Sequence, residues 1–312
     1  FLTDNYYSES DPEATGLDTT GAASRADSLD RGGPAALQAQ RAAADTTRHR
    51  QLGLSLELLA LTAYQRVDGL RLGMGGEARV GAQLCADAAA AYGFSSFDWQ
   101  GRGGIEFGRR RGARVRLAAS LLNEPFGPAP AGRSLGAFAL LFGDDRRDYL
   151  QKRRYECEIV PWSGTGHSAS LTLFARRDES REAATDFHLV GGGTPMEDPN
   201  PAVTEGTSQG AELRLQLGRE RAPARLTLEA GACGGPAGGD HEFNWQAVQA
   251  DLRRTVLSGG LLSLTLEGAN AGGSPPLQAA SYLGGDATLR GFERLEFAGR
   301  QRARLRLEYA FG

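Results

Sequence analysis

Apolar and polar residues alternate with a period of two along most of the chain beyond residue 50. The pattern is clearest at residues 212–217 (Glu-Leu-Arg-Leu-Gln-Leu), at residues 262–267 (Leu-Ser-Leu-Thr-Leu-Glu) and from Arg302 to Phe311. Successive side chains of a β-strand point to opposite faces of the sheet, so this alternation predicts strands with one apolar and one polar face. We therefore expect an all-β protein.

About twelve strands are predicted from this alternation and from the turn residues between the repeats. They cover residues 52–63, 67–80, 82–95, 98–109, 112–122, 148–162, 166–178, 208–218, 224–232, 243–256, 260–271 and 300–311. The first three have the weakest patterns: residues 52–63 also suit a helix, and the turn near Gly81 lacks the usual turn residues. Counting residues 52–63 as a strand gives the even number that a closed bacterial barrel requires.

The connections between these strands alternate in length. Short turns at Gly112, 163–166, 218–223 and 258–260 separate long connections at 123–147, 179–209, 232–241 and 272–300. Outer-membrane barrels have short turns on the periplasmic side and long loops on the outside. The polar positions are also rich in arginine, which a hydrated lumen tolerates. The sequence thus favours an antiparallel transmembrane β-barrel over a soluble sandwich.

Composition divides the chain into two parts. Residues 1–50 show no periodicity, and Asp, Ser, Thr, Gly and Ala dominate from Ser8 to Asp30, which is typical of an exposed linker or periplasmic segment. Residues 51–312 form the predicted barrel. A net charge of −3 gives no basis for nucleic-acid binding. No apolar run reaches the roughly 18–20 residues that a membrane helix needs.

Candidate catalytic chemistry is sparse. The sequence around His167 and Ser168 lacks the final glycine of a nucleophile elbow, and the four histidines lack metal-ligand spacing. Glycine-rich residues 73–76 and 101–104 precede strands rather than helices, so neither is a nucleotide-binding loop. Three cysteines without CxxC spacing give no zinc site and no disulfide framework. We expect no enzymatic activity, no cofactor and no bound metal.

The most specific motif precedes the last predicted strand. Tyr282-Leu283-Gly284-Gly285 is followed by Leu289-Arg290-Gly291-Phe292, then by Gly299 and by Glu308-Tyr309. This order resembles the surface-antigen barrel of the bacterial outer-membrane assembly superfamily, which includes BamA-like insertases, two-partner-secretion transporters and patatin-fused barrels. In that family the loop folds back into the lumen, and its arginine pairs with acidic residues of the inner wall. The resemblance therefore implies an inward-folding loop at residues 272–299.

Carried over residue by residue, the resemblance assigns the loop motif to Gly284, Gly285, Leu289, Arg290, Gly291 and Phe292. A guanidinium can hold two carboxylate oxygens at once and so fix a long loop. Residues two apart on a strand point to the same face. Glu308 is therefore expected to face the lumen together with the arginines of its strand, which makes it the candidate lumen partner of Arg290. Residues 64–70 (Tyr-Gln-Arg-Val-Asp-Gly-Leu) are a second match, to the opening of the barrel in some members.

The resemblance implies insertion or export of polypeptide at the bacterial outer membrane, without a cofactor. The implied partners are outer-membrane lipid, lipopolysaccharide, a polypeptide substrate and periplasmic domains. Three alternatives stay open: the membrane anchor or secretion pore of a larger protein, a passive channel or structural barrel, and a soluble β-sandwich binding module. Larger family barrels carry several more strands after this loop. The chain is therefore either a twelve-stranded barrel or part of a sixteen-stranded one, and the position of the loop favours the second.

Overall fold

The computed structural model describes residues 52–109, 112–127, 140–141, 145, 147–164, 166–185, 187, 189–190, 200–218, 223–234, 238–255, 260–284, 292 and 296–310. The predicted linker at residues 1–50 lies outside this part of the chain. The strands are β1 (Leu52–Leu58), β2 (Ala63–Gln65), β3 (Gly69–Val80), β4 (Leu84–Gly93), β5 (Asp98–Gly108), β6 (Arg114–Phe126), β7 (Asp148–Gly164), β8 (His167–Ser180), β9 (Gly206–Leu217), β10 (Ala224–Cys233), β11 (Phe243–Thr255), β12 (Leu261–Gly273), β13 (Ser281–Leu283), β14 (Phe297–Gly299) and β15 (Gln301–Ala310). A short 3-10 helix, η2, spans Leu277–Ala279.

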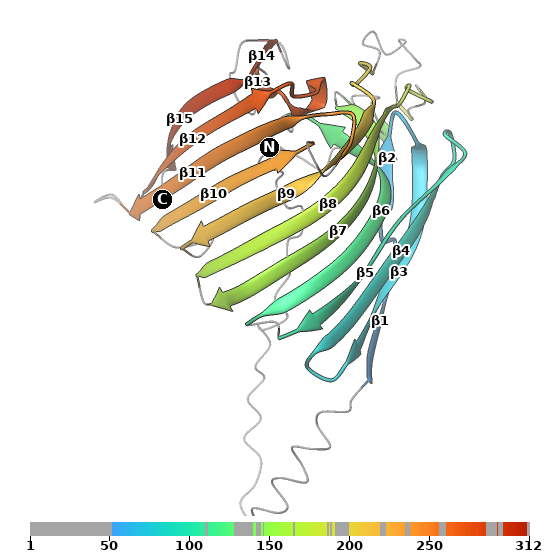
Figure 1. Cartoon of the computed structure of the whole chain (residues 1–312). Coiled ribbons are helices and arrows are strands. Elements are labelled where there is room, and N and C mark those ends of the chain that lie inside the picture. The colour runs from blue at the N-terminus through green and yellow to red at the C-terminus, as the bar shows by residue number, and fades with distance from the viewer. Residues whose placement is uncertain are drawn as a thin grey trace, which may run out of the picture.

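Nearly all the strands belong to one curved antiparallel sheet (Figure 1). Its order is β1-β3-β4-β5-β6-β7-β8-β9-β10-β11-β12-β15, with the short β2 paired to β3, and β13 and β14 form a separate hairpin. Each long strand therefore pairs with its neighbours in sequence. Among the described residues, β1 and β15 each pair on one side only, so the sheet is open at both edges.

The all-β, antiparallel class predicted from the sequence is confirmed, and each of the predicted strands is present. The helical alternative for the first of them is wrong, since Leu52–Leu58 pair with β3. That strand is shorter than predicted because Leu59 and Leu61 adopt positive φ angles of 72° and 59°, which turn the chain. The turn between β3 and β4, which lacks the usual turn residues, is made by Gly81. Its φ of 64° is a conformation that glycine adopts most readily.

The two faces of the sheet differ in chemistry. One face, called here the inner face, carries alternating charged residues such as Arg116, Glu229 and Glu267. The opposite, outer face exposes large apolar side chains on every long strand. Its density of charged side chains is lower than that of the inner face. These outer residues include Leu54, Met74, Leu84, Ile105, Leu117, Tyr155, Leu173, Leu213, Leu228, Val248, Leu266 and Leu305. An ordinary water-soluble sheet buries its apolar face, whereas this one does not.

The connections sort by length between the two ends of the strands. Sequential antiparallel pairing makes successive connections emerge at opposite ends of the sheet. The short ones, at residues 81–83, 109–113, 165–166, 218–223 and 256–260, share one end, called here the turn end. The opposite loop end carries the connections at 127–147, 181–205 and 274–300 together with shorter ones.

Two buried clusters lie on the inner face toward the loop end. Phe174, Phe243 and Trp245 pack with Cys233 and with Ala279 from η2. Phe126 and Leu150 pack with Val203, which belongs to the connection between β8 and β9. In both clusters a residue from a loop-end connection covers side chains of the sheet. The described parts of these two connections around Val203 and Ala279 are therefore packed onto the inner face.

Candidate functional site at the loop end

Only part of the loop motif lies within the described residues. Gly284 follows β13 with a φ of 120°, and Phe292 packs edge-on against Phe297, with ring centroids 5.2 Å apart. Gly285, Leu289, Arg290 and Gly291 lie outside the described residues. The pairing of Leu283 with Phe297 brings the two flanks of the motif together, so β13 and β14 form the base of the loop.

Glu308 lies at the turn end of β15, opposite Ser263, and forms an ion pair with Arg306. The loop enters β15 at Gln301. At a rise of about 3.3 Å per residue, Glu308 is roughly 23 Å further along the strand. The predicted pair of Arg290 with Glu308 remains a prediction, because Arg290 is not among the described residues.

Glu267 on β12 is an acidic residue nearer the loop, and the sequence did not single it out. Its carboxylate contacts Arg304 on β15, and its other oxygen lies 3.8 Å from Arg302. Its side chain is largely buried on the inner face. Two arginines therefore share one carboxylate. Recognising this site from sequence would have required the register of β12 against β15, which alternation alone does not give.

The described start of the long loop contacts the inner face directly. Gln278 donates from Nε2 to Asp178 on β8 at 2.9 Å and to the backbone oxygen of Thr204 at 2.9 Å. Ala279 sits in the aromatic cluster. Tyr282 is buried and donates its hydroxyl proton to the backbone oxygen of Leu277 at 2.7 Å. Burial, with a smaller effect of the Asp148 carboxylate, raises the pKa of Tyr282 to about 12.

The second motif, residues 64–70, contains the most completely bonded carboxylate of the region. Asp68 is fully buried. Its Oδ1 accepts hydrogen bonds from Asn123 (2.7 Å) and Ser96 (3.0 Å), and its Oδ2 accepts from Gln100 (2.7 Å) and, more weakly, from Arg71 (3.4 Å). Four side chains from separate parts of β3, β5, β6 and the β4–β5 connection thus meet at one carboxylate.

Asp68 and Gln100 lie where the pairing of two adjacent strands stops. The ladder between β5 and β6 ends at Gly101 and Leu121, although both strands continue toward the loop end. There the side-chain oxygen of Gln100 accepts the backbone N–H of Asn123 at 2.8 Å. A side chain therefore replaces the next ladder bond, and Asp68 occupies this junction of the sheet.

Arg66, two residues earlier, contacts both the start of β7 and the neighbouring connections. Its Nη2 lies 2.8 Å from Asp148 at the start of β7 and 3.3 Å from the side-chain oxygen of Asn200. Its backbone N–H donates to Asp145 at 3.0 Å. Its backbone oxygen accepts from the N–H groups of Ala184 and Thr185 at 2.8 and 3.1 Å. Arg66 is itself buried, so these contacts are shielded from water.

The rest of the inner face carries paired charges. Arg116 contacts Asp87 at 2.7 Å across the intervening β5, and Arg214 contacts Glu229 at 3.0 Å. The described residues contain no group of acidic, histidine or cysteine side chains that could hold a metal ion. Their three cysteines are free. Among them we also find no helix with the length and apolar character to cross a membrane.

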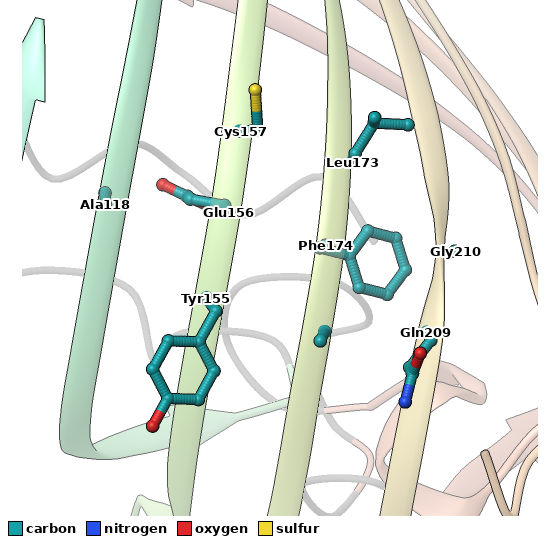
Figure 2. Close-up of a pocket in the computed structure, with 9 residues that line it drawn as sticks. Ala118, Tyr155, Glu156, Cys157, Leu173, Phe174, Gln209 and Gly210 are labelled. Carbon is teal, nitrogen blue, oxygen red and sulfur yellow. The ribbon is translucent and has the colours of Figure 1, made fainter. Parts of the chain in front are cut away.

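A shallow depression of about 360 Å³ spans β6 to β9. Tyr155, Glu156 and Cys157 come from one strand and Leu173 and Phe174 from the next (Figure 2). Tyr155 and Leu173 are half exposed at its rim, so the depression is open to the outside. The charged or amide side chains of its lining are Glu156 and Gln209, and Glu156 is already paired with Arg154 on the same strand.

Comparison with known proteins adds no relative: no model of a known protein family matches the chain, and no curated protein is similar enough in sequence to count as a match.

Proposed function

We propose that this chain is an outer-membrane β-barrel domain of the surface-antigen type, and that it inserts or exports polypeptide at the bacterial outer membrane. The observation that carries the membrane assignment is the outer face. Large apolar side chains are exposed there from one edge of the sheet to the other: Leu54 on β1 is 75 % exposed, Leu117 on β6 is 57 % and Leu305 on β15 is 68 %.

Such a surface is costly in water and favourable in lipid. Apolar area exposed to water costs about 25 cal/mol per Å², and soluble monomers rarely expose contiguous apolar patches beyond a few hundred Å². Lipid removes this cost without requiring a second packed layer. The charged inner face suits a hydrated lumen, and the sorting of connections into a turn end and a loop end matches the transmembrane barrel pattern.

The polypeptide-handling part of the proposal rests on two further features. The first is the resemblance of the motif at residues 284–292 to that of the assembly superfamily. The second is the pair of sheet edges, since among the described residues β1 and β15 each pair on one side only and so leave a side on which an incoming strand can add. An extended polypeptide adding to such an edge gains main-chain hydrogen bonds, which supplies free energy without a cofactor.

A passive channel or structural barrel is the second candidate, and the inner-face ion pairs favour it. Arg116 with Asp87 and Arg214 with Glu229 neutralise one another within the wall. Such mutually satisfied charges stabilise a wall and leave little unpaired charge to recognise a substrate. A membrane anchor for a larger protein would need only such a stable wall.

One reconstitution experiment separates these functions. The full-length protein is purified in detergent, tested for heat-modifiable gel mobility and inserted into lipid vesicles. The folding of a second outer-membrane barrel protein into these vesicles is then timed, with empty vesicles as the control. Faster folding of that substrate supports the proposal. Insertion with ion conductance but no effect on folding favours the passive channel, and water solubility without detergent overturns the membrane assignment.

A further inference from the structure

Charged side chains are nearly absent from the outer face of the described strands, and those that occur there lie at strand ends. The outward positions that hold Asp, Glu, Lys or Arg are Arg153 on β7, Arg177 and Glu179 on β8, and Arg254 on β11. We propose that Arg153 and Arg177 bind the phosphate group of a lipid headgroup in the leaflet at the loop end. The inference rests on the proposed membrane barrel and adds a defined lipid site to it.

The two arginines face each other across neighbouring strands. Arg153 pairs in register with Arg177, and both side chains are exposed. Residues directly opposite each other in an antiparallel pair have Cβ atoms about 4.5–5.5 Å apart, and like charges in this arrangement repel one another. A phosphate between the two guanidinium groups would replace this repulsion with two attractive contacts, because each guanidinium presents a fork of N–H groups that fits phosphate oxygens.

The inner face holds the same arrangement in neutralised form. Arg154 on β7 lies in register with Arg176 on β8. The Nε of Arg154 is 2.7 Å from the carboxylate of Glu156, and the Nε of Arg176 is 3.8 Å from that of Asp178. Each inner arginine therefore has a carboxylate partner on its own strand.

The outer pair is compensated less completely. Arg177 contacts Glu179 at 2.8 Å in an exposed ion pair, whereas Arg153 forms no ion pair within the described part of the chain. Asp240 also interacts electrostatically with Arg177, but its carboxylate already accepts the backbone N–H and the hydroxyl of Thr207 at 2.7 and 2.9 Å. Two arginines thus share one exposed carboxylate partner, which leaves positive charge available to an anion.

The position of the pair matches the edge of a bilayer. On β7 the outward side chains between Arg153 and Trp162 are Tyr155, Cys157 and Ile159, none of which carries a fixed charge. At a rise of about 3.3 Å per residue and a strand tilt of about 40°, the distance from Arg153 to Trp162 spans about 23 Å of membrane. The apolar band of a transmembrane barrel is about 25 Å tall, so the arginines would lie where the headgroups begin.

The side chains below the arginines favour a lipid over a free anion. Figure 2 shows the ring of Tyr155 directed away from Cys157, toward the loop end of β7, and the amide of Gln209 pointing the same way. A tyrosine in this orientation keeps its ring beside acyl chains and its hydroxyl among headgroups. The charged pair therefore adjoins both an apolar surface and further hydrogen-bonding groups, as an amphipathic ligand requires.

The test measures binding of fluorescently labelled lipid A, a glycolipid with two phosphate groups, to the full-length protein in uncharged detergent micelles. The variants are Arg153→Gln, Arg177→Gln and Arg254→Gln. Arg254 is exposed on the outer face at the turn end, opposite Leu262, so its substitution is the matched control. Heat-modifiable gel mobility reports whether each variant is folded. Lipid A without its phosphates and inorganic phosphate serve as competitors.

We expect Arg153→Gln and Arg177→Gln each to weaken binding about tenfold, because charged hydrogen bonds to phosphate are lost. Arg254→Gln should bind like the unchanged protein, and lipid A without phosphates should compete poorly. Glu179→Gln releases Arg177 from its own carboxylate and should tighten binding about threefold. A misfolded variant would not bind more tightly, so this substitution keeps the test decisive.

Equal affinity of the unchanged protein and both arginine variants would overturn the inference, as would equal competition by lipid A without phosphates. Displacement of the labelled lipid by an equal concentration of inorganic phosphate would show a site for free phosphate and overturn the lipid assignment. These results leave the proposed function intact as long as the protein requires detergent and shows heat-modifiable mobility. Solubility without detergent would instead refute the membrane assignment, and the lipid site with it.

Discussion

At the scale of single residues, Asp68 illustrates what the sequence reveals and what it hides. Residues 64–70 were recognisable as a motif by resemblance, but nothing in them indicates that Gln100 and Asn123 complete the site. Those partners lie 32 and 55 residues away along the chain. They reach Asp68 because the pairing of β5 with β6 ends at Gly101 and Leu121, next to Gln100 and Asn123. Such contacts depend on register and strand curvature, which a period-two pattern leaves undetermined.

Replacement of Asp68 by asparagine should be strongly destabilising. The amide group would direct N–H groups at donors and leave Arg71 without its carboxylate in a buried site. Removing one partner of a buried ion pair typically costs about 3–5 kcal/mol. Asp87→Asn, on the partly exposed pair with Arg116, should cost about 1 kcal/mol or less. The midpoint of urea unfolding in vesicles measures both, and equal shifts would argue against the central role of Asp68.

The buried hydroxyl of Tyr282 predicts that docking of its loop depends on pH. Its folded-state pKa of about 12 lies above the ordinary value of 10, so the neutral phenol is favoured when the loop is docked. The stabilisation is therefore complete below pH 10 and is lost as the pH rises toward 12. Proteolysis of the segment around residues 274–284 should accelerate in that window. Tyr282→Phe, which cannot ionise, should remove this pH dependence; an identical pH profile in the variant would refute the assignment.

Arg290 is the central residue of the loop motif that was assigned by resemblance. Glu308 and Glu267 are the two candidate acidic partners for its guanidinium, and substitutions can distinguish them. Arg290→Ala should loosen the loop and impair polypeptide insertion while the sheet still assembles. If Glu308 is the partner, Glu308→Gln should reproduce this effect; if the carboxylate nearer the loop is used, Glu267→Gln should do so instead. Loop proteolysis and the folding assay provide the readouts. Full function and unchanged protease sensitivity in Arg290→Ala would exclude the assignment.

At the scale of elements, the strands were predictable because alternation is a local signal. The predicted strands and the observed ones agree closely for β3 to β12 and for β15, whereas the short hairpin of β13 and β14 falls within the stretch predicted as a long connection. The exception is informative: residues 59–63 look like a continuation of β1, yet positive φ angles at two leucines fold them onto the inner face. Leucine rarely adopts that conformation, so no sequence rule anticipates it. Tertiary contacts of Ala60 and Thr62 with β3 compensate for the backbone cost.

The contact between this turn and β3 can be tested with a small substitution. Gly75→Val should be destabilising, because a Cβ there would lie 2.8 Å from that of Ala89 and 3.0 Å from that of Ala60. Overpacking of this kind costs about 1–3 kcal/mol. Gly53→Val, on the open edge strand where the nearest atom is 3.8 Å away, is the matched control and should be close to neutral. Thermal unfolding in detergent compares the two, and a larger loss from the control would contradict the packing.

At the scale of the whole molecule, the same alternation that defines each strand creates two continuous faces once the strands are aligned. The two buried clusters cover only part of the inner face, and large apolar side chains stay exposed on the outer face of the described strands, which is the pattern expected if that face meets an apolar medium. The alternation of apolar and polar positions was enough to predict the division into two faces, because every long strand pairs with its sequence neighbours. The open edges were not predictable, because closure depends on what pairs with β1 and β15, and that information is not contained in any single strand.

Leu117 and Ala118 are adjacent on β6 but point to opposite faces, which makes them a matched pair for testing the medium on each side. Leu117→Arg would place a charge on the outer face; in lipid this costs about 2–4 kcal/mol near the bilayer midplane. In water the same change at a side chain that is 57 % exposed would be close to neutral. Ala118→Arg faces inward beside Glu156 on β7 and should be tolerated in either case. Folding yields into lipid vesicles, scored by gel mobility with and without heating, distinguish these outcomes. A selective loss for Leu117→Arg supports the membrane-facing outer surface, and equal yields for the two variants would show that lipid does not contact it.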